Sequence, residues 1–226
     1  MSEAKYFVFD VESGGIDVFE DRVVQFFGAT ADRDGNLIDT WEIFINPGVD
    51  IAQGAIDVHG FTNEFLRDNG AQPADAFEDI RALFLKHRHL GIVAFNMNYD
   101  LSILDSEMKR HNVTETFGSW FSENAALIDG LVIDRAKDKY RKGKRTLESQ
   151  ARHYGVPFDS DEAHDARYDV EKTAQVTSRI VGKYGTPTTK QQSQWYQAWA
   201  DNFEQYKRET DRNFKMDNKD WPLRLA

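Results

Sequence analysis

Two carboxylates stand at the end of the first apolar run of the chain. Asp10 and Glu12 follow four large apolar residues, 6–9, and precede Gly14 and Gly15. The apolar run predicts a strand buried on both faces, and because side chains at i and i+2 of a strand point to the same side, the two acids project together. Carboxylates this close repel each other, so a divalent cation with oxygen ligands is a natural partner. An ordinary strand-to-loop junction with two solvated acids is the alternative, and this stretch alone leaves both open.

Two further acids stand near the starts of expected helices. Asp100 follows a buried strand expected at 91–95 and lies in the first turn of the next helix, near the positive end of the helix dipole. Asp169 lies five residues after His164, near the start of a helix expected at about 166–184. Each acid alone has an ordinary explanation, as a helix N-terminal acid or a solvated helix residue.

The remaining pattern predicts the elements that would position these acids. Residues 22–30 and 37–46 are strand-like and flank the turn signal at 34–36, which predicts a β-hairpin and an antiparallel meander with the first strand. Apolar residues at helical spacing in 74–89 predict a helix that leads into a parallel strand at 91–95. The further expected elements are a short strand at 125–128, a helix capped by Thr146 that ends at Gly155, and the long helix at 166–184. This mixture predicts an α/β sandwich with a mixed sheet.

The composition limits the class of protein. The 226 residues leave room for one substantial domain and an appendage, and no apolar run approaches the about 18 residues that a membrane span needs. No signal peptide is visible, so we expect a cytoplasmic protein with no membrane partner. Because the chain has no cysteine, any metal must be held by Asp, Glu, His or carbonyl oxygens, which favours magnesium or manganese. The net charge of −10 argues against a protein that simply coats nucleic acid, although an enzyme with a local positive charge remains open.

The segment after residue 186 has a different character. Trp195, Trp199, Phe203 and Tyr206 follow one another at spacings of four, four and three, which places an aromatic stripe on a helix. We expect this stripe to pack on the domain, and docking to a partner is the alternative. The run 221–223 is expected to anchor the end of the chain.

Together and in this order, the acidic segments resemble the motifs of the DEDD exonuclease superfamily, within the ribonuclease H-like fold. The run Phe9-Asp10-Val11-Glu12-Ser13-Gly14-Gly15 is similar to its first motif, Asn96-Met97-Asn98-Tyr99-Asp100 to its second, and the spacing of His164 and Asp169 to its third. A histidine at that spacing identifies the histidine branch, and the resemblance is closest to the epsilon proofreading subunits of bacterial DNA polymerase III and their stand-alone bacterial or phage relatives. One departure is Ser13-Gly14-Gly15, where many relatives have Thr-Thr-Gly.

The resemblance spans residues 5–184 and implies a mixed five-stranded sheet flanked by helices. It also covers 44–47, 58–65, Asp129, 144–147 and 154–156. We therefore expect an exonuclease domain at 1–185 and an aromatic-rich helical extension at 186–226 packed on that domain.

The resemblance also implies the chemistry. Asp10, Glu12, Asp100 and Asp169 would hold two divalent cations, Mg²⁺ or Mn²⁺, with Asp10 bridging both. His164 would be the general base, since an imidazole with a pKa of about 6.5 accepts a proton near neutrality. Without the matching acids, a capping or surface histidine would be the preferred interpretation of His164.

Further residues are candidates for substrate contacts. Asn96 would hydrogen-bond the terminal nucleotide, Ser13 offers the one hydroxyl of the first motif, and Ile16 and Phe61 would form apolar walls against the base or sugar. His59 either lines the pocket or fixes its loop. The other histidines have no motif context and are expected at the surface: His87, His89, His111 and His153.

A basic run lies between residues 135 and 145. Most charge runs are solvated faces, but in a chain of net charge −10 that acts on a polyanion, this one is expected to guide phosphates. Its seven members are Arg135, Lys137, Lys139, Arg141, Lys142, Lys144 and Arg145.

These features predict a 3′→5′ exonuclease that releases 5′-mononucleotides from single-stranded or frayed DNA ends. An RNA-trimming enzyme similar to ribonuclease T or oligoribonuclease is one alternative, because the sequence does not reveal what surrounds the 2′ position. A binding module that kept the fold and lost catalysis is another, and the full set of acids with His164 argues against it. A polymerase or another replication or repair protein is the partner that the resemblance suggests.

Overall fold

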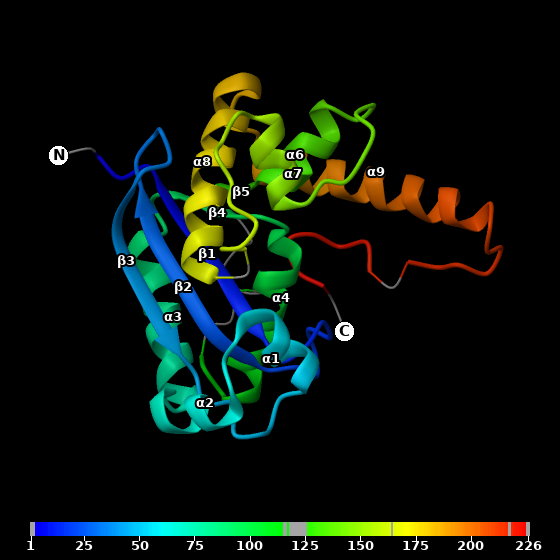
Figure 1. Ribbon diagram of the computed structural model, residues 1–226. Coiled ribbons are helices and arrows are strands. Elements are labelled where there is room, and N and C mark those ends of the chain that lie inside the picture. The colour runs from blue at the N-terminus through cyan, green and yellow to red at the C-terminus, as the bar shows by residue number, and fades with distance from the viewer. Residues whose placement is uncertain (1–2, 115–116, 118–125, 164, 217, 225–226) are drawn as a thin grey trace.

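A mixed five-stranded sheet forms the centre of the computed structural model (Figure 1), which describes residues 3–114, 117, 126–163, 165–216 and 218–224. The sheet has the order β3-β2-β1-β4-β5, with β1 at Tyr6–Ser13, β2 at Val23–Ala31, β3 at Leu37–Phe44, β4 at Gly91–Ala94 and β5 at Ala126–Asp129. The first three strands form an antiparallel meander, whereas β4 pairs in parallel with β1 and β5. The mixed sheet predicted from the sequence is confirmed.

Helices cover both faces of this sheet. In chain order, those that the structure describes are α1 at Gln53–His59, α2 at Asn63–Asn69, α3 at Pro73–His87, α4 at Met97–Arg110, α6 at Gly130–Lys137, α7 at Leu147–His153, α8 at Ala166–Tyr184 and α9 at Thr189–Arg208. Thr146 caps α7, as the sequence predicts, because its side chain accepts a hydrogen bond from the backbone N–H of Ser149 (3.3 Å). In Figure 1, α8 crosses the sheet on the side opposite α3.

The alternation of β1 separates the core into two layers. Phe7 and Phe9 belong to the hydrophobic cluster that includes the buried residues of α3 and α4. Tyr6 and Val8 belong to a second cluster, together with the buried residues of α8. Because side chains alternate along a strand, the next even-numbered positions of β1 also point toward the α8 side.

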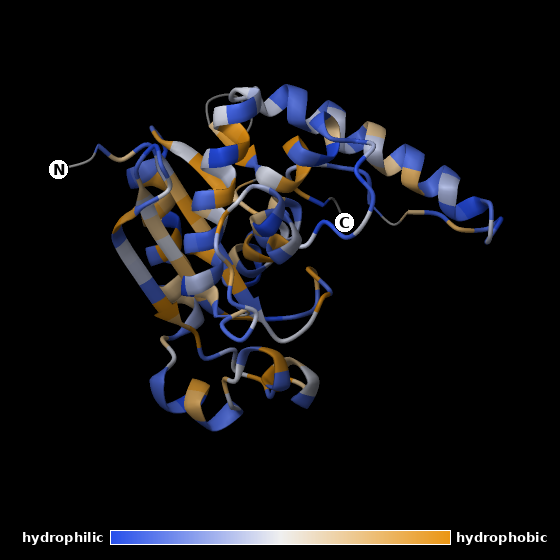
Figure 2. Cartoon of the chain, turned by 45° about the horizontal axis from the view of Figure 1, so that its top comes forward, coloured by the Kyte–Doolittle hydropathy of each residue, from blue (hydrophilic) through white to orange (hydrophobic). Residues whose placement is uncertain are grey.

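The C-terminal segment packs against β5 and α6 through α9. The buried residues of α9 are Gln192, Tyr196, Ala200 and Glu204. Trp195 and Trp199 of the aromatic stripe lie one position before Tyr196 and Ala200, are half-buried and pack against the core, as the sequence predicts. In Figure 2, α9 is mainly hydrophilic with a few hydrophobic residues, whereas hydrophobic residues are more frequent in the sheet. The division of the chain at residue 185 stays a prediction.

Of the four histidines expected at the surface, His111 is half-buried and His87 lies in the core. His87 is buried. Its ring stacks on that of Phe7 with centroids 5.1 Å apart, and its centroid lies 4.9 Å from that of Trp41. The expectation was wrong because the last turn of α3 faces the sheet, which a residue without a motif does not reveal.

None of the described helices combines the length and apolar character needed to cross a membrane. The cytoplasmic location expected from the sequence stays a prediction.

Candidate active site

The two acids of β1 lie where its second core layer ends. Tyr6 and Val8 pack toward α8, and Asp10 and Glu12 continue the same side of the strand. The first turn of α8 carries Asp169, so the fold brings this acid to the acids of β1. The predicted projection of Asp10 and Glu12 to one side follows directly from the regular pairing of β1 with β2 up to Glu12.

Asp100 is positioned by a buried carboxylate that the sequence pattern alone did not explain. Asp129 accepts hydrogen bonds from the backbone N–H groups of Asn96 (3.3 Å) and Met97 (3.0 Å), which fixes the start of α4. Its Oδ1 also accepts from the N–H of Leu131 (2.9 Å), at the start of α6. Asp129 therefore holds the ends of two helices at β5, and the first turn of α4 presents Asp100.

The four acids line one cavity of about 780 Å³. The cavity is formed by the end of β1, the glycine loop after it, α1 and the first turns of α4 and α8. Of the other residues predicted from the sequence, it is also lined by Ser13, Ile16, His59 and Asn96. His164, the predicted general base, lies outside the described residues.

Burial and mutual repulsion disfavour the charged forms of these carboxylates. Burial first, and then the charges of the neighbouring acids, raises the pKa of Asp10 well above its ordinary value. Burial, with the nearby charges of Asp169 and Asp165, raises the pKa of Glu12 to about 8. Burial is also the main cause that raises the pKa of Asp100. Within the described chain, neither Lys nor Arg forms an ion pair with Asp10, Glu12 or Asp100.

This arrangement fits divalent cations. Buried carboxylates without a cationic partner are stabilised when hard cations with oxygen ligands bind between them. Among the described residues, the group whose ligand atoms all lie within 4.8 Å of one another is instead Asp134, Asp138 and His153. No three of the four site acids, all of which the structure describes, meet this distance criterion.

The group around Asp134 is already satisfied by the protein. The buried Asp134 carboxylate forms ion pairs with Arg141 (2.6 Å) and Arg145, and its Oδ1 accepts a hydrogen bond from the Tyr154 hydroxyl (2.7 Å). Arg141 also pairs with Asp138 at 3.2 Å. Because these contacts already compensate the charge of Asp134, this group does not require a metal ion. The same contacts hold the loop 138–146 in place.

The basic run therefore divides into two kinds of residue. Arg141 and Arg145 are tied to Asp134, whereas Lys142 and Lys144 are exposed. Arg145 lines the acidic cavity and so does Arg135, but the predicted contacts Arg141, Lys142 and Lys144 do not. The phosphate contacts expected of Arg141, Lys142 and Lys144 stay predictions.

His59 has a structural bond and also borders the cavity. Its Nδ1 accepts a hydrogen bond from the backbone N–H of Phe61 (3.0 Å), and the two rings stack with centroids 5.1 Å apart. Burial lowers the pKa of His59, which favours the neutral ring that can accept this bond. Phe61 packs against Phe44 and Phe65 and is not among the residues that line the cavity, so its substrate contact stays a prediction.

Tyr99 is a cavity residue to which the sequence analysis gave no role. Its hydroxyl lies 2.6 Å from the Ser13 hydroxyl and donates to the Gly15 carbonyl oxygen at 2.6 Å. Tyr99 therefore connects the start of α4 to the glycine loop, at the tip of which Ile16 is 88% exposed. The position of Tyr99 beside Asp100 was the only available signal, since its partners are more than 80 residues away in the sequence.

Comparison with known families gives a match over most of the chain. A family model described as "Exonuclease" matches residues 7–177. The chain is 28% identical over 172 residues to the DNA polymerase III PolC-type of Pediococcus pentosaceus and 30% identical over 182 residues to that of Staphylococcus haemolyticus. These alignments cover 76% and 80% of this chain but only 11% and 12% of the two relatives.

Solved structures show the same fold. Exonuclease I of E. coli in complex with a dA16 oligonucleotide matches with a TM-score of 0.69 and 21% identity, over 80% of this chain and 42% of that protein. Exonuclease I of Methylocaldum szegediense matches with a TM-score of 0.65 and 22% identity, over 80% of this chain and 41% of that one. The likeness is one of fold, and it covers less than half of either neighbour.

Proposed function

The chain belongs to the exonuclease family, and from this membership we propose that it is a metal-dependent 3′→5′ exonuclease that releases 5′-mononucleotides from single-stranded or frayed DNA ends. The observation that carries the proposal is the placement of Asp10, Glu12, Asp100 and Asp169 around one cavity. The first three are buried or half-buried acids whose pKa values are raised, a costly arrangement that a cation site explains.

The four acids would hold two divalent cations, Mg²⁺ or Mn²⁺. When bound, such ions neutralise charge on the phosphate and lower the pKa of an attacking water. His164 would accept the proton of that water as general base. Ile16, Asn96 and His59 would surround the terminal nucleotide, and the bond between Ser13 and Tyr99 keeps the loop that carries Ile16 closed onto α4.

DNA is the proposed substrate because of the relatives. The curated relatives are DNA polymerases, and the E. coli neighbour was solved with a DNA oligonucleotide. A polymerase is for the same reason the proposed partner. The chain spans about a tenth of those relatives, so both are proposals about this chain rather than properties transferred from them.

The test uses single strands labelled at the 5′ end, as DNA and as RNA of the same sequence, with Mn²⁺, Mg²⁺ or EDTA. We expect a ladder that shortens from the 3′ end, needs metal and disappears in Asp10→Asn. Asp68→Asn is the matched control, because Asp68 is an exposed carboxylate of α2 away from the cavity. Cleavage in excess EDTA would overturn the mechanism, internal cuts in a 3′-blocked strand would overturn the polarity, and faster cleavage of RNA would overturn the choice of DNA.

A further inference from the structure

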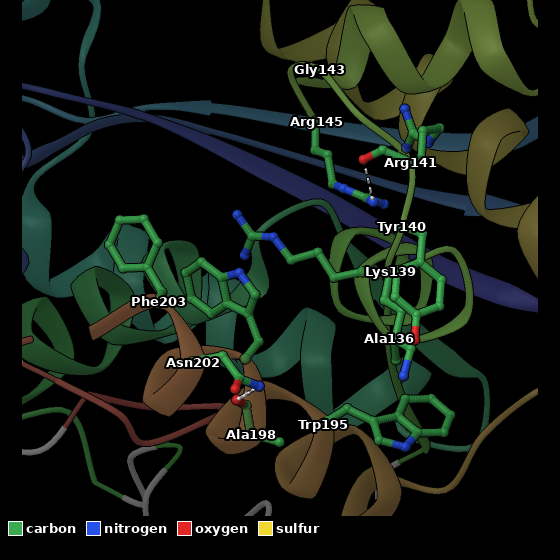
Figure 3. A pocket seen from close by; sticks show the side chains of 12 residues that line it. Ala136, Lys139, Tyr140, Arg141, Gly143, Arg145, Trp195, Ala198, Asn202 and Phe203 are labelled. Atoms are coloured by element: carbon green, nitrogen blue, oxygen red, sulfur yellow. Dashed lines mark hydrogen bonds between the residues drawn. The ribbon is translucent and has the colours of Figure 1, made fainter. Parts of the chain in front are cut away.

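A second cavity lies beside the acidic one, between α9 and the segment 135–145. Its volume is about 720 Å³. Figure 3 shows Trp195, Ala198, Asn202 and Phe203 of α9 along one side, and Lys139, Tyr140 and Arg141 on the other. We call this cavity the aromatic groove. Because α9 begins at Thr189, this surface includes residues beyond the part of the chain that matches the exonuclease family.

Arg135 joins the groove to the acidic cavity. Both cavities are lined by Arg135 and Arg145. Arg145 is held by Asp134, but the Arg135 guanidinium lies 3.8 Å from the centre of the Trp199 ring and has no ion-pair or hydrogen-bond partner among the described residues. A guanidinium oriented by stacking, with its N–H donors unused, is suited to bind phosphate.

Cationic side chains lie against aromatic rings in the groove and, at Lys137, beside it. The Lys137 ammonium lies 4.8 Å from the centre of the Trp195 ring, and the Lys139 ammonium lies 4.8 Å from that of Tyr140. Tyr140 is 83% exposed, so its ring is available for stacking without any change in the fold. Positive charge along a backbone path combined with aromatic faces is the chemistry by which proteins bind single-stranded nucleic acid.

The opposite side of the acidic cavity repels a polyanion. A smaller cavity there, of about 560 Å³, shares Val58 and His59 with the acidic cavity. The described residues that line it include five acids, Asp57, Asp161, Glu162, Asp165 and Glu171, and a single Lys or Arg side chain, that of Arg167. A strand whose end is held at the four acids is therefore attracted toward Arg135 and repelled on the other side.

We propose that the aromatic groove binds the nucleotides that lie upstream of the 3′ end of a single-stranded nucleic acid. Arg135 contacts a phosphate at the boundary between the two cavities, and Tyr140 and Trp195 stack on bases beyond it. The direction of the strand rests on the proposed function, whereas the stacking and charge contacts do not.

The test measures binding against length. Oligothymidylates from a dinucleotide to a dodecanucleotide, labelled at the 5′ end, are titrated by fluorescence anisotropy in calcium, and the recovered strand is checked on a denaturing gel. We expect the affinity of the wild type to rise with length. Tyr140→Ala should bind the longer strands with an affinity roughly fivefold or more below that of the wild type, because this is the lower end of what stacking of one base contributes. Lys139→Gln should bind the same strands more weakly and make this binding less dependent on salt.

Two controls match these changes in chemistry. Tyr206→Ala removes an aromatic residue of α9 that is 65% exposed and outside the groove. Lys86→Gln removes an ammonium that lies 5.5 Å from the Trp41 ring, on the side of the sheet covered by α3. Both control variants should bind oligothymidylates of every length with the affinity of the wild type. Equal affinity of Tyr140→Ala, Lys139→Gln and the wild type at all lengths would overturn the proposal.

Photocrosslinking separates this inference from the proposed activity. A strand with one 5-iodouracil upstream of its 3′ end should crosslink to Tyr140 or Trp195, whether or not the protein cleaves it. Crosslinks confined to the α1 side of the acidic cavity would overturn the groove as the path, even for an active exonuclease. If the wild-type protein crosslinks through the groove but does not cleave the strand, only the proposed function is overturned. A groove that takes a peptide would give neither length-dependent binding nor these crosslinks.

Discussion

Asp134→Asn tests whether the loop beside both cavities is held by a buried charge. The Asp134 side chain is 0% exposed and pairs with Arg141 and Arg145, whose side chains are 15% and 13% exposed. Removing one partner of a buried ion pair costs about 3–5 kcal/mol, because the other charge is left uncompensated. Since both arginines retain some contact with water, we expect Asp134→Asn to lose stability at the lower end of this range, about 3 kcal/mol.

Urea denaturation in EDTA measures this loss without any contribution from metal. With a slope of about 3 kcal/mol per molar, the midpoint of Asp134→Asn should fall by about 1 M. Asp138→Asn is the matched control, since the Asp138 side chain is 29% exposed and its pairs with Arg141 (3.2 Å) and His153 (3.3 Å) are partly solvated. It should lose less than about 1 kcal/mol. Equal losses in the two variants would refute the assignment of Asp134 as the centre of this loop.

Three further predictions concern the acidic cavity and the exposed lysines. His164→Ala should slow cleavage by about 10²–10⁴ with metal affinity unchanged, and loss of metal affinity would make His164 a ligand instead. Replacing Lys142 and Lys144 by Gln should weaken binding of long strands equally for all sequences and lower the salt slope by about one unit for each phosphate that is no longer neutralised, as measured by titration at several salt concentrations. In EDTA, the raised pKa of Glu12, about 8, means that the folded state binds more protons than the unfolded chain between pH about 4.5 and 8. The melting temperature of the metal-free protein should therefore fall as pH rises through this window, and Mn²⁺ should reverse the fall; a melting temperature that rises with pH would contradict this sign.

The sequence predicted those parts of the site that depend on spacing within one element. The period of two along β1 was enough to place Asp10 and Glu12 on one side, and the first turn of a helix was enough to place Asp100. Both follow from backbone geometry, which a run of apolar residues reveals. Bringing these acids to Asp169 required the family resemblance, because no local pattern specifies which helix crosses which strand.

What the sequence could not predict depends on contacts between distant segments. Arg141 and Lys142 are neighbours in one basic run, yet Arg141 pairs with the buried Asp134 and Lys142 is exposed. The face that α9 buries is likewise decided by what it packs on, which is β5 and α6, and the half-buried stripe at Trp195 and Trp199 is left to line a cavity. Amphipathic spacing predicts which residues share a face of a helix, but it does not predict which neighbouring element packs on that face.

Residues after 188 support the acidic cavity as well as lining the groove. Asn98, in the first turn of α4, donates to the carbonyl oxygen of Asp220 (2.8 Å) and accepts from Nε of Arg224 (2.8 Å). Trp221 is buried, and its indole N–H donates to Asp129 at 3.4 Å, the same carboxylate that fixes the start of α4. These contacts brace the helix that carries Asp100 against repulsion from the other acids. Because the residues after 188 both brace the helix of Asp100 and border the proposed path of the strand, we expect their contributions to activity and to strand binding to be inseparable.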